Sequence, residues 1–183
     1  MNAFFTIGHS TRPIEAFVEL LRANEVTRLV DVRTVPRSRT NPQYNVDALP
    51  GLLAPHGIAH EHLAALGGLR KRHADIPPEV NGFWENQSFH NYADYAMSSP
   101  VFAAGLARLE EIGRLERCAV MCAESVWWRC HRRIVTDYLL AAGHDVFHIL
   151  ESPVPEPARI TPEATPTREG RLRYPASQAG LGF

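Results

Sequence analysis

Two cysteines, a histidine and three arginines stand within one short stretch, AVMCAESVWWRCHRR at 119–133. The chain of 183 residues contains only three cysteines, so the presence of both Cys122 and Cys130 here needs a physical reason. The thiolate is the form of cysteine that attacks substrates and binds metals, and nearby arginines or a helix amino terminus lower a thiol's pKa. The stretch therefore predicts a reactive thiol, a metal site, or two core cysteines that flank a loop.

The spacing of these residues bears on the metal alternative. Structural zinc motifs usually separate their cysteines by two to four residues, whereas seven residues separate Cys122 from Cys130. The adjacent Cys130 and His131 cannot easily point at one ion, and a further ligand would have to come from His9 or Glu124. Zinc is therefore the less favoured interpretation, and the sequence requires no cofactor.

Hydrophobic patterning predicts the elements that position these residues. Short apolar runs alternate with segments whose apolar residues recur at helical spacing, which is typical of βαβ units with right-handed crossovers. We expect a three-layer α/β fold with a mainly parallel five-stranded sheet, helices on both faces and a Rossmann-like or rhodanese-like layout. The predicted strands are 3–7, 26–32, 58–63, 117–122 and 145–150, and the predicted helices start near Pro13, include Leu49 to Leu53, cover 89–97, restart after Ser99 and cover 131–142.

Composition indicates one globular domain followed by an arm. Apolar residues make up 45% and charged residues 21% of the chain, the net charge is −1, and no apolar run is long enough to cross a membrane. The first residues lack the pattern of a signal peptide, so we expect a cytoplasmic protein with no membrane partner. Residues 1–150 are expected to form the single α/β domain, and the proline-rich 151–183 an extended arm or flexible tail. The sequence does not indicate an oligomeric state.

The segments that follow the predicted strands are candidates for binding an anion. Ligands of such sheets bind outside the carboxyl ends of the strands, and three of these loops hold nine of the nineteen basic residues. The planar guanidinium suits phosphate or carboxylate, so an anionic small molecule or nucleotide is the expected ligand, with a solvated charged rim as the alternative. The candidate substrate-binding residues are Ser10, Asp31, Arg33, Arg37, Arg39, Asn41, Arg70, Cys130 and Arg132.

Cys122 is the candidate nucleophile because it ends a predicted strand just before a loop that leads into a helix. His9, Glu124 and His131 are the candidates for proton transfer. Cys118 lies deeper in the same strand, and we expect a buried structural role for it. An inert core role is the alternative for Cys122.

Six short motifs are spread over the chain: TIGHS at 6–10, VDVR at 30–33, PRSRTNPQYN at 36–45, LGGLRK at 66–71, FHNYADY at 89–95 and MCAES with RCHRR within 121–133. Taken together, they resemble a widespread prokaryotic family catalogued as domain of unknown function 488. The resemblance covers roughly residues 4 to 150 and implies the fold, since the family name assigns no activity. A weaker similarity to rhodanese-like sulfurtransferases implies a persulfide on Cys122, although Glu124 would repel an anion there.

The leading hypothesis is an enzyme that acts on an anionic, nucleotide or phosphate-bearing substrate. The main alternative is a nucleic-acid-binding module that uses the same arginines and the basic REGRLR of the arm, against which stands the absence of a large net positive charge. A metal-dependent protein and a rhodanese-like sulfur carrier are the further alternatives.

Overall fold

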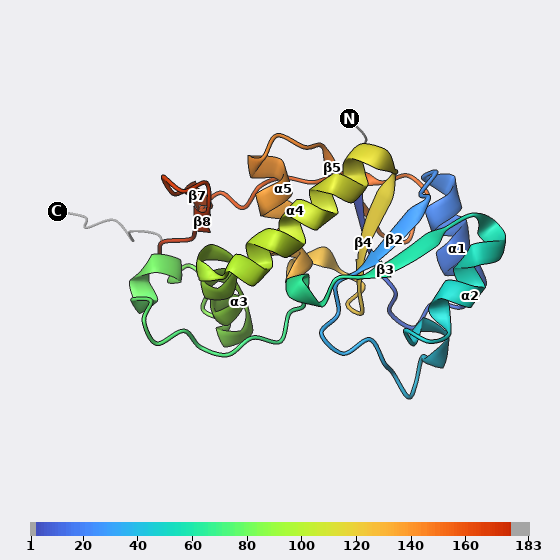
Figure 1. Cartoon of the computed structure of the whole chain (residues 1–183), viewed down its shortest axis with the longest axis horizontal. Helices are drawn as coiled ribbons and strands as arrows, with labels where there is room; N and C mark the ends of the chain where they lie inside the picture. The colour runs from blue at the N-terminus through green and yellow to red at the C-terminus, as the bar shows by residue number, and fades with distance from the viewer. Residues whose placement is uncertain (1–2, 177–183) are drawn as a thin grey trace.

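A mainly parallel sheet lies at the centre of the structure, a computed structural model that describes residues 3–176 (Figure 1). Five strands run parallel in the order β3-β2-β4-β1-β5, and a short sixth strand, β6, joins β5 in the antiparallel direction. The three-layer α/β fold predicted from the sequence is confirmed, with β6 added to the five expected strands. The strands are β1 (Phe4–Gly8), β2 (Arg28–Asp31), β3 (Ala59–His62), β4 (Cys118–Cys122), β5 (Val146–Ile149), β6 (Glu156–Pro157), β7 (Thr165–Pro166) and β8 (Leu172–Arg173).

Helices cover both faces of this sheet, and each face has its own hydrophobic core. Phe17 of α1 and Leu49 of α2 are buried with Phe5 and Met121 on one face. The other face buries a larger core, supplied by α3, α4 and α5. None of the helices formed by residues 3–176 is long and apolar enough to span a membrane. The helices are α1 (Ile14–Ala23), α2 (Leu49–Leu53), α3 (Gln87–Ser98), α4 (Pro100–Leu115) and α5 (Arg132–Ala141).

Local sequence explains where two of these helices begin. The Ser99 hydroxyl accepts the backbone N–H groups of Val101 at 3.2 Å and Phe102 at 3.4 Å, and Pro100 occupies the first helical position of α4. The start of this helix was predicted from the Ser-Pro pair and is confirmed. Asn86 caps α3 in the same way.

The strand order places the cysteine loop in the middle of the carboxyl edge. β4 lies between β2 and β1, so its end meets the ends of both neighbours. The backbone N–H of His9 donates to the carbonyl of Cys122 at 2.9 Å, and the N–H of Val32 donates to that of Met121 at 2.9 Å. The segments after three strands that are distant in sequence therefore lie side by side.

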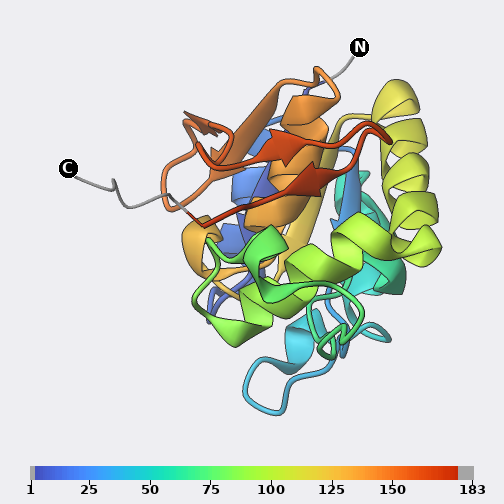
Figure 2. The same cartoon turned by 90° about the vertical axis from the view of Figure 1, so that its left-hand side faces the viewer.

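The proline-rich arm packs against the domain over residues 151–176. Its β7–β8 hairpin, drawn in red in Figure 2, lies across α5. Leu172 and Tyr174 are buried in the larger core, and the Tyr174 hydroxyl donates to Asp137 Oδ2 at 3.0 Å. Residues 177–183, the rest of the predicted tail, lie outside the described residues.

Candidate functional site

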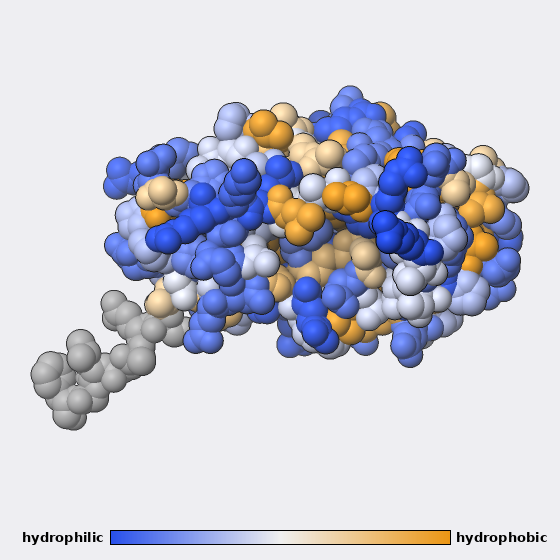
Figure 3. Space-filling view, turned by 90° about the horizontal axis from the view of Figure 1, so that it is seen from below, coloured by the Kyte–Doolittle hydropathy of each residue, from blue (hydrophilic) through white to orange (hydrophobic). Residues whose placement is uncertain are grey.

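A pocket of about 340 Å³ opens at the carboxyl edge of the sheet, where β4 ends. Figure 3 views the molecule from below, the side toward which β4 runs in Figure 1, and shows hydrophobic side chains in a central hollow between hydrophilic ones. The pocket therefore combines apolar walls with charged groups, as small-molecule sites commonly do. Its lining residues are Arg33, Val35, Gly68, Leu69, Ser88, Phe89, Cys122, Ala123, Glu124, Arg129, Cys130 and His131.

Cys130 and His131 form a thiol–imidazole pair within this pocket. Cys130 Sγ lies 3.5 Å from His131 Nδ1, and His131 Nε2 lies 3.0 Å from the carbonyl oxygen of Val32. Since a carbonyl only accepts, Nε2 carries a proton, and a neutral His131 must then present an unprotonated Nδ1 to the thiol. His131 is thereby oriented to take the proton of Cys130.

The surroundings of Cys130 favour its ionised form. Burial opposes ionisation, but the thiol of Cys122, His131 and the guanidinium of Arg132 together hold the pKa of Cys130 well below its ordinary value. The backbone N–H of Arg132 also donates to Cys130 Sγ at 3.4 Å, from the first turn of α5. Cys130 is therefore the thiolate of the site.

Cys122 differs from Cys130 although both line the pocket. Burial raises the pKa of Cys122 well above its ordinary value, and the neighbouring Cys130 raises it further. Its S–H donates to the Glu124 carbonyl at 3.7 Å. These surroundings favour the protonated form of Cys122, and the contacts with His131 and the N–H of Arg132 favour Cys130 as the thiolate of the pair. Cys118 is fully buried with its pKa raised by burial to about 12, in line with the structural role expected for it.

Gly68 makes room for the His131 ring. A Cβ at position 68 would lie 2.5 Å from His131 Nδ1, closer than side-chain atoms approach one another. Gly8 has a similar role, since a Cβ there would collide with the Glu124 carbonyl of the cysteine loop. Two of the glycines in the motifs TIGHS and LGGLRK are thus explained by close approach to this site.

Arg33 lines the pocket, and hydrogen bonds to buried partners fix its guanidinium. Its guanidinium donates to both carboxylate oxygens of Asp31, at 2.9 and 2.6 Å, and to the Tyr44 carbonyl at 2.6 Å. Burial alone would raise the pKa of Asp31, but the hydrogen bonds from Arg33 and the nearby imidazole of His60, whose Nε2 lies 3.7 Å from Asp31 Oδ2, lower it to about 2. Asp31 is therefore a positioning residue for Arg33.

His9 belongs to the same support and does not line the pocket. Its Nδ1 donates to the Ser10 carbonyl at 2.8 Å, and its Nε2 accepts from Arg33 at 3.2 Å. Burial lowers the pKa of His9 to about 4, so the ring is neutral near pH 7. Both ring nitrogens make hydrogen bonds, so His9 helps to position Arg33 and has no free nitrogen for proton transfer.

Two further candidate arginines direct their guanidinium groups into the protein. Arg70 donates to the carbonyls of Gly67 and Ala64, at 2.9 and 2.8 Å, and stacks on Tyr95. Arg132 is buried and donates to the carbonyl of Glu124 at 2.8 Å, so it fixes the cysteine loop. The positive edge expected from the sequence is therefore weaker than the count of arginines implied.

The structure brings five of the candidate residues together around the pocket: Arg33, Cys122, Glu124, Cys130 and His131. It places the other candidates around but outside the pocket lining: His9, Ser10, Asp31, Arg37, Arg39, Asn41, Arg70 and Arg132. Ser10 lines a separate hollow beside Arg12. The sequence-based list missed the apolar walls Val35, Leu69 and Phe89, and the exposed Arg129 at the rim. No sequence pattern indicates that Val35 and Leu69 are exposed at the pocket, whereas Phe89 belongs to the motif FHNYADY.

No group of three or more His, Cys, Asp or Glu side chains within residues 3–176 is arranged to hold a metal ion. Cys122, Cys130 and His131 gather at the pocket, but the imidazole nitrogens of His131 face Cys130 and a carbonyl. The zinc interpretation of the sequence therefore gains no support from this geometry.

A model of the protein family described as "Domain of unknown function DUF488" matches residues 13–139 of the chain. The matched segment includes all the lining residues of the pocket, from Arg33 to His131. No curated protein and no solved structure matches the chain.

Proposed function

The chain belongs to the DUF488 family, whose name assigns no activity, and we propose that it is a thiol-dependent enzyme. In this proposal Cys130 is the nucleophile, His131 its general base, and the substrate a small molecule that carries a phosphate or another anionic group. We propose a nucleotide as the substrate class.

The contact between Cys130 Sγ and His131 Nδ1 at 3.5 Å carries this proposal. A nucleophilic thiol needs a base within reach and a third group that orients the base, and Val32 supplies the third group through its carbonyl. The base takes the thiol proton, the thiolate attacks the electrophilic atom of the substrate, and the protonated imidazole can return the proton to the leaving group.

The walls of the pocket support a substrate with an apolar or planar part and an anionic part. Phe89, Leu69 and Val35 form apolar surface, while Arg33 lines the same space. Arg129 is exposed at the pocket and takes part in none of the ion pairs found within residues 3–176, so its guanidinium is free to meet an anion. A nucleotide has both parts, a stacking base and a phosphate.

We place this activity in the cytoplasm as part of the same proposal. All three cysteines are free thiols, and a thiolate nucleophile depends on a reducing compartment.

The experiment that tests the proposal is iodoacetamide labelling of native, metal-free protein as a function of pH, resolved cysteine by cysteine by mass spectrometry. We expect Cys130 to label with an apparent pKa well below the ordinary value of about 8.5, and Cys118 not to label at all. Adenosine monophosphate should slow the labelling of Cys130, and Arg129→Gln should reduce that protection, whereas Arg22→Gln on the far helix α1 should not.

Normal titration of Cys130, or equal labelling of Cys130 and Cys122, would overturn the assignment of the nucleophile. A low pKa without any protection by adenosine monophosphate would reject the nucleotide as the ligand class and leave the thiol chemistry in place. His131→Gln tests the role of the base by itself: it should raise the apparent pKa of Cys130 while leaving the cysteine accessible.

A further inference from the structure

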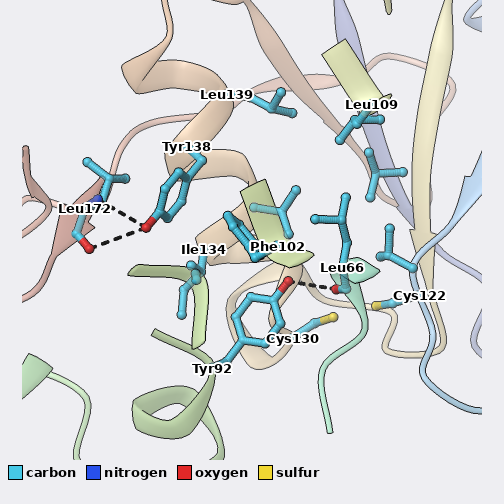
Figure 4. Close-up of a cluster of buried hydrophobic side chains, with 14 of the residues drawn as sticks. Leu66, Tyr92, Phe102, Leu109, Cys122, Cys130, Ile134, Tyr138, Leu139 and Leu172 are labelled. Atoms are coloured by element: carbon cyan, nitrogen blue, oxygen red, sulfur yellow. Dashed lines mark hydrogen bonds between the residues drawn. The ribbon is translucent and has the colours of Figure 1, made fainter. Parts of the chain in front are cut away.

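Cys122 and Cys130 line one pocket from the two ends of the cysteine loop, and this arrangement permits a second reaction. Cys122 ends β4, and Cys130 stands just before α5. Figure 4 shows their sulfur atoms turned toward each other, beside Tyr92 and below Leu66. The two thiols are close enough that each changes the ionisation of the other.

We propose that Cys122 and Cys130 form a reversible disulfide when a hydroperoxide enters the pocket. The sulfur of Cys130 is oxidised first, and Cys122 is the resolving thiol. This inference rests on the thiolate assigned to Cys130 in the proposed function. It adds a modification site, the pair itself, and a substrate class, the hydroperoxides.

The first step oxidises Cys130. Its thiolate attacks one oxygen of the hydroperoxide, the O–O bond breaks, and a proton joins the departing alkoxide or hydroxide to give an alcohol or water. Sulfur loses two electrons and becomes a sulfenic acid, while the peroxide gains them. The N–H of Arg132, which lies 3.4 Å from Cys130 Sγ, stabilises the negative charge on sulfur before attack.

The second step joins the two sulfurs. The thiol of Cys122 attacks the sulfenic sulfur, the S–O bond breaks as the S–S bond forms, and the hydroxyl leaves as water with the Cys122 proton. A thiol that keeps its proton until this moment does not compete for the peroxide in the first step. A dithiol reductant later returns both cysteines to the thiol form by exchange.

The surroundings favour this partner over any other for Cys130. Cys118, the remaining cysteine, is fully buried within the strand and does not line the pocket. Cys122 and Cys130 both do, with 2% and 6% of their surface exposed, so a small oxidant in the pocket reaches them while a second protein molecule does not. An intramolecular bridge is therefore expected in place of a disulfide-linked dimer.

The test uses the reduced full-length protein treated with equimolar hydrogen peroxide in the absence of other thiols. We expect the intact mass to fall by two hydrogens, a peptide that links Cys122 to Cys130 after digestion, and full recovery of both thiols with dithiothreitol. Cys122→Ser should instead accumulate a sulfenic acid on Cys130 that dimedone traps, Cys130→Ser should stay unoxidised, and Cys118→Ser should behave as the wild-type protein does.

A wild-type protein in which peroxide yields a lasting sulfenic or sulfinic acid on Cys130 with Cys122 still free would overturn the inference. So would a bridge between two protein molecules, or no reaction at all with peroxide. These outcomes are distinct from failure of the proposed function, which is read from the pH dependence of iodoacetamide labelling: a low Cys130 pKa without a disulfide rejects the bridge alone. Because the decisive reading is made on the wild-type protein, it does not depend on how well the serine variants fold.

Discussion

Replacing Gly68 by alanine should displace His131 and raise the pKa of Cys130. The new Cβ would lie 2.5 Å from His131 Nδ1, while ordinary contact begins at 3.4 Å, so the ring must retreat by about 0.9 Å. The ring is held at 3.5 Å from Cys130 Sγ and at 3.0 Å from the Val32 carbonyl, and a shift of that size lengthens at least one of these contacts.

The size of the effect follows from what His131 contributes. An opposite charge within about 4–6 Å shifts a pKa by about 1–3 units, so weakening the pair should raise the apparent pKa of Cys130 by about 1 unit or more. One unit corresponds to about 1.4 kcal/mol and to about a tenfold smaller thiolate fraction at a pH below the pKa. Iodoacetamide labelling of Cys130 should therefore slow by about that factor at a pH below its wild-type pKa, and the midpoint of its pH profile should rise by about 1 unit or more.

Gly51→Ala is the matched control, because a Cβ at that position of α2 meets no atom within 4 Å. Crowding at Gly68 is also expected to cost about 1–3 kcal/mol of stability, so labelling is measured at a temperature where both variants are folded by circular dichroism. If Gly68→Ala labels with the pKa and rate of Gly51→Ala and the wild-type protein, the role assigned to His131 is wrong.

Two further predictions concern the stability of the fold. Leu172→Ala, in the arm, should lower the free energy of unfolding measured with urea by about 2–5 kcal/mol because the Leu172 side chain is 1% exposed. Leu115→Ala is the control and should change it by less than about 0.5 kcal/mol because Leu115 is 76% exposed. Equal effects would show that the arm does not belong to the cooperative core. Burial lowers the pKa of His148 to about 4, so between pH 6.5 and 4 the unfolded chain binds a proton there that the folded protein does not, and stability falls by up to about 3 kcal/mol. Burial raises the pKa of Asp137 to about 6, which gives the opposite pH dependence, so the test must isolate the contribution of His148. It compares the loss of stability between pH 6.5 and 4 in the wild-type protein and in His148→Gln. The loss should be smaller in the variant, and an unchanged loss would contradict the assignment.

The alternation of strands and helices could be predicted from the sequence because each element carries its own periodicity. The Ser99–Pro100 start of α4 is local, and so is the placement of Cys122 at the end of a strand. The order of the strands is not local: that β4 lies between β2 and β1 depends on pairings between segments about a hundred residues apart. This order decides which loops meet, and so which side chains form the site.

The contacts that decide the chemistry of each residue could not be predicted from the sequence either. Arg70 reads as a free cation, yet its donors are used by carbonyls three to six residues before it. The sequence did not indicate that His131 faces the sulfur of the adjacent Cys130, a contact that depends on the room left by Gly68 and on the Val32 carbonyl. In the arm, the high proline content obscured the alternation of Leu172 and Tyr174, two residues that are buried in the core.

The two pocket cysteines occupy different backbone surroundings. Cys122 stands where a strand ends and is buried, and its S–H donates to the carbonyl of Glu124 at 3.7 Å. Cys130 stands where a helix begins, and the backbone N–H of Arg132 donates to its sulfur at 3.4 Å. Carbonyl groups stabilise a thiol and N–H groups stabilise a thiolate, so a loop that joins a strand end to a helix start places the two forms of cysteine side by side. The same argument explains why a thiolate would be expected at the second cysteine of such a loop even if His131 were replaced, with a pKa raised by the loss of the imidazole but still below that of Cys122.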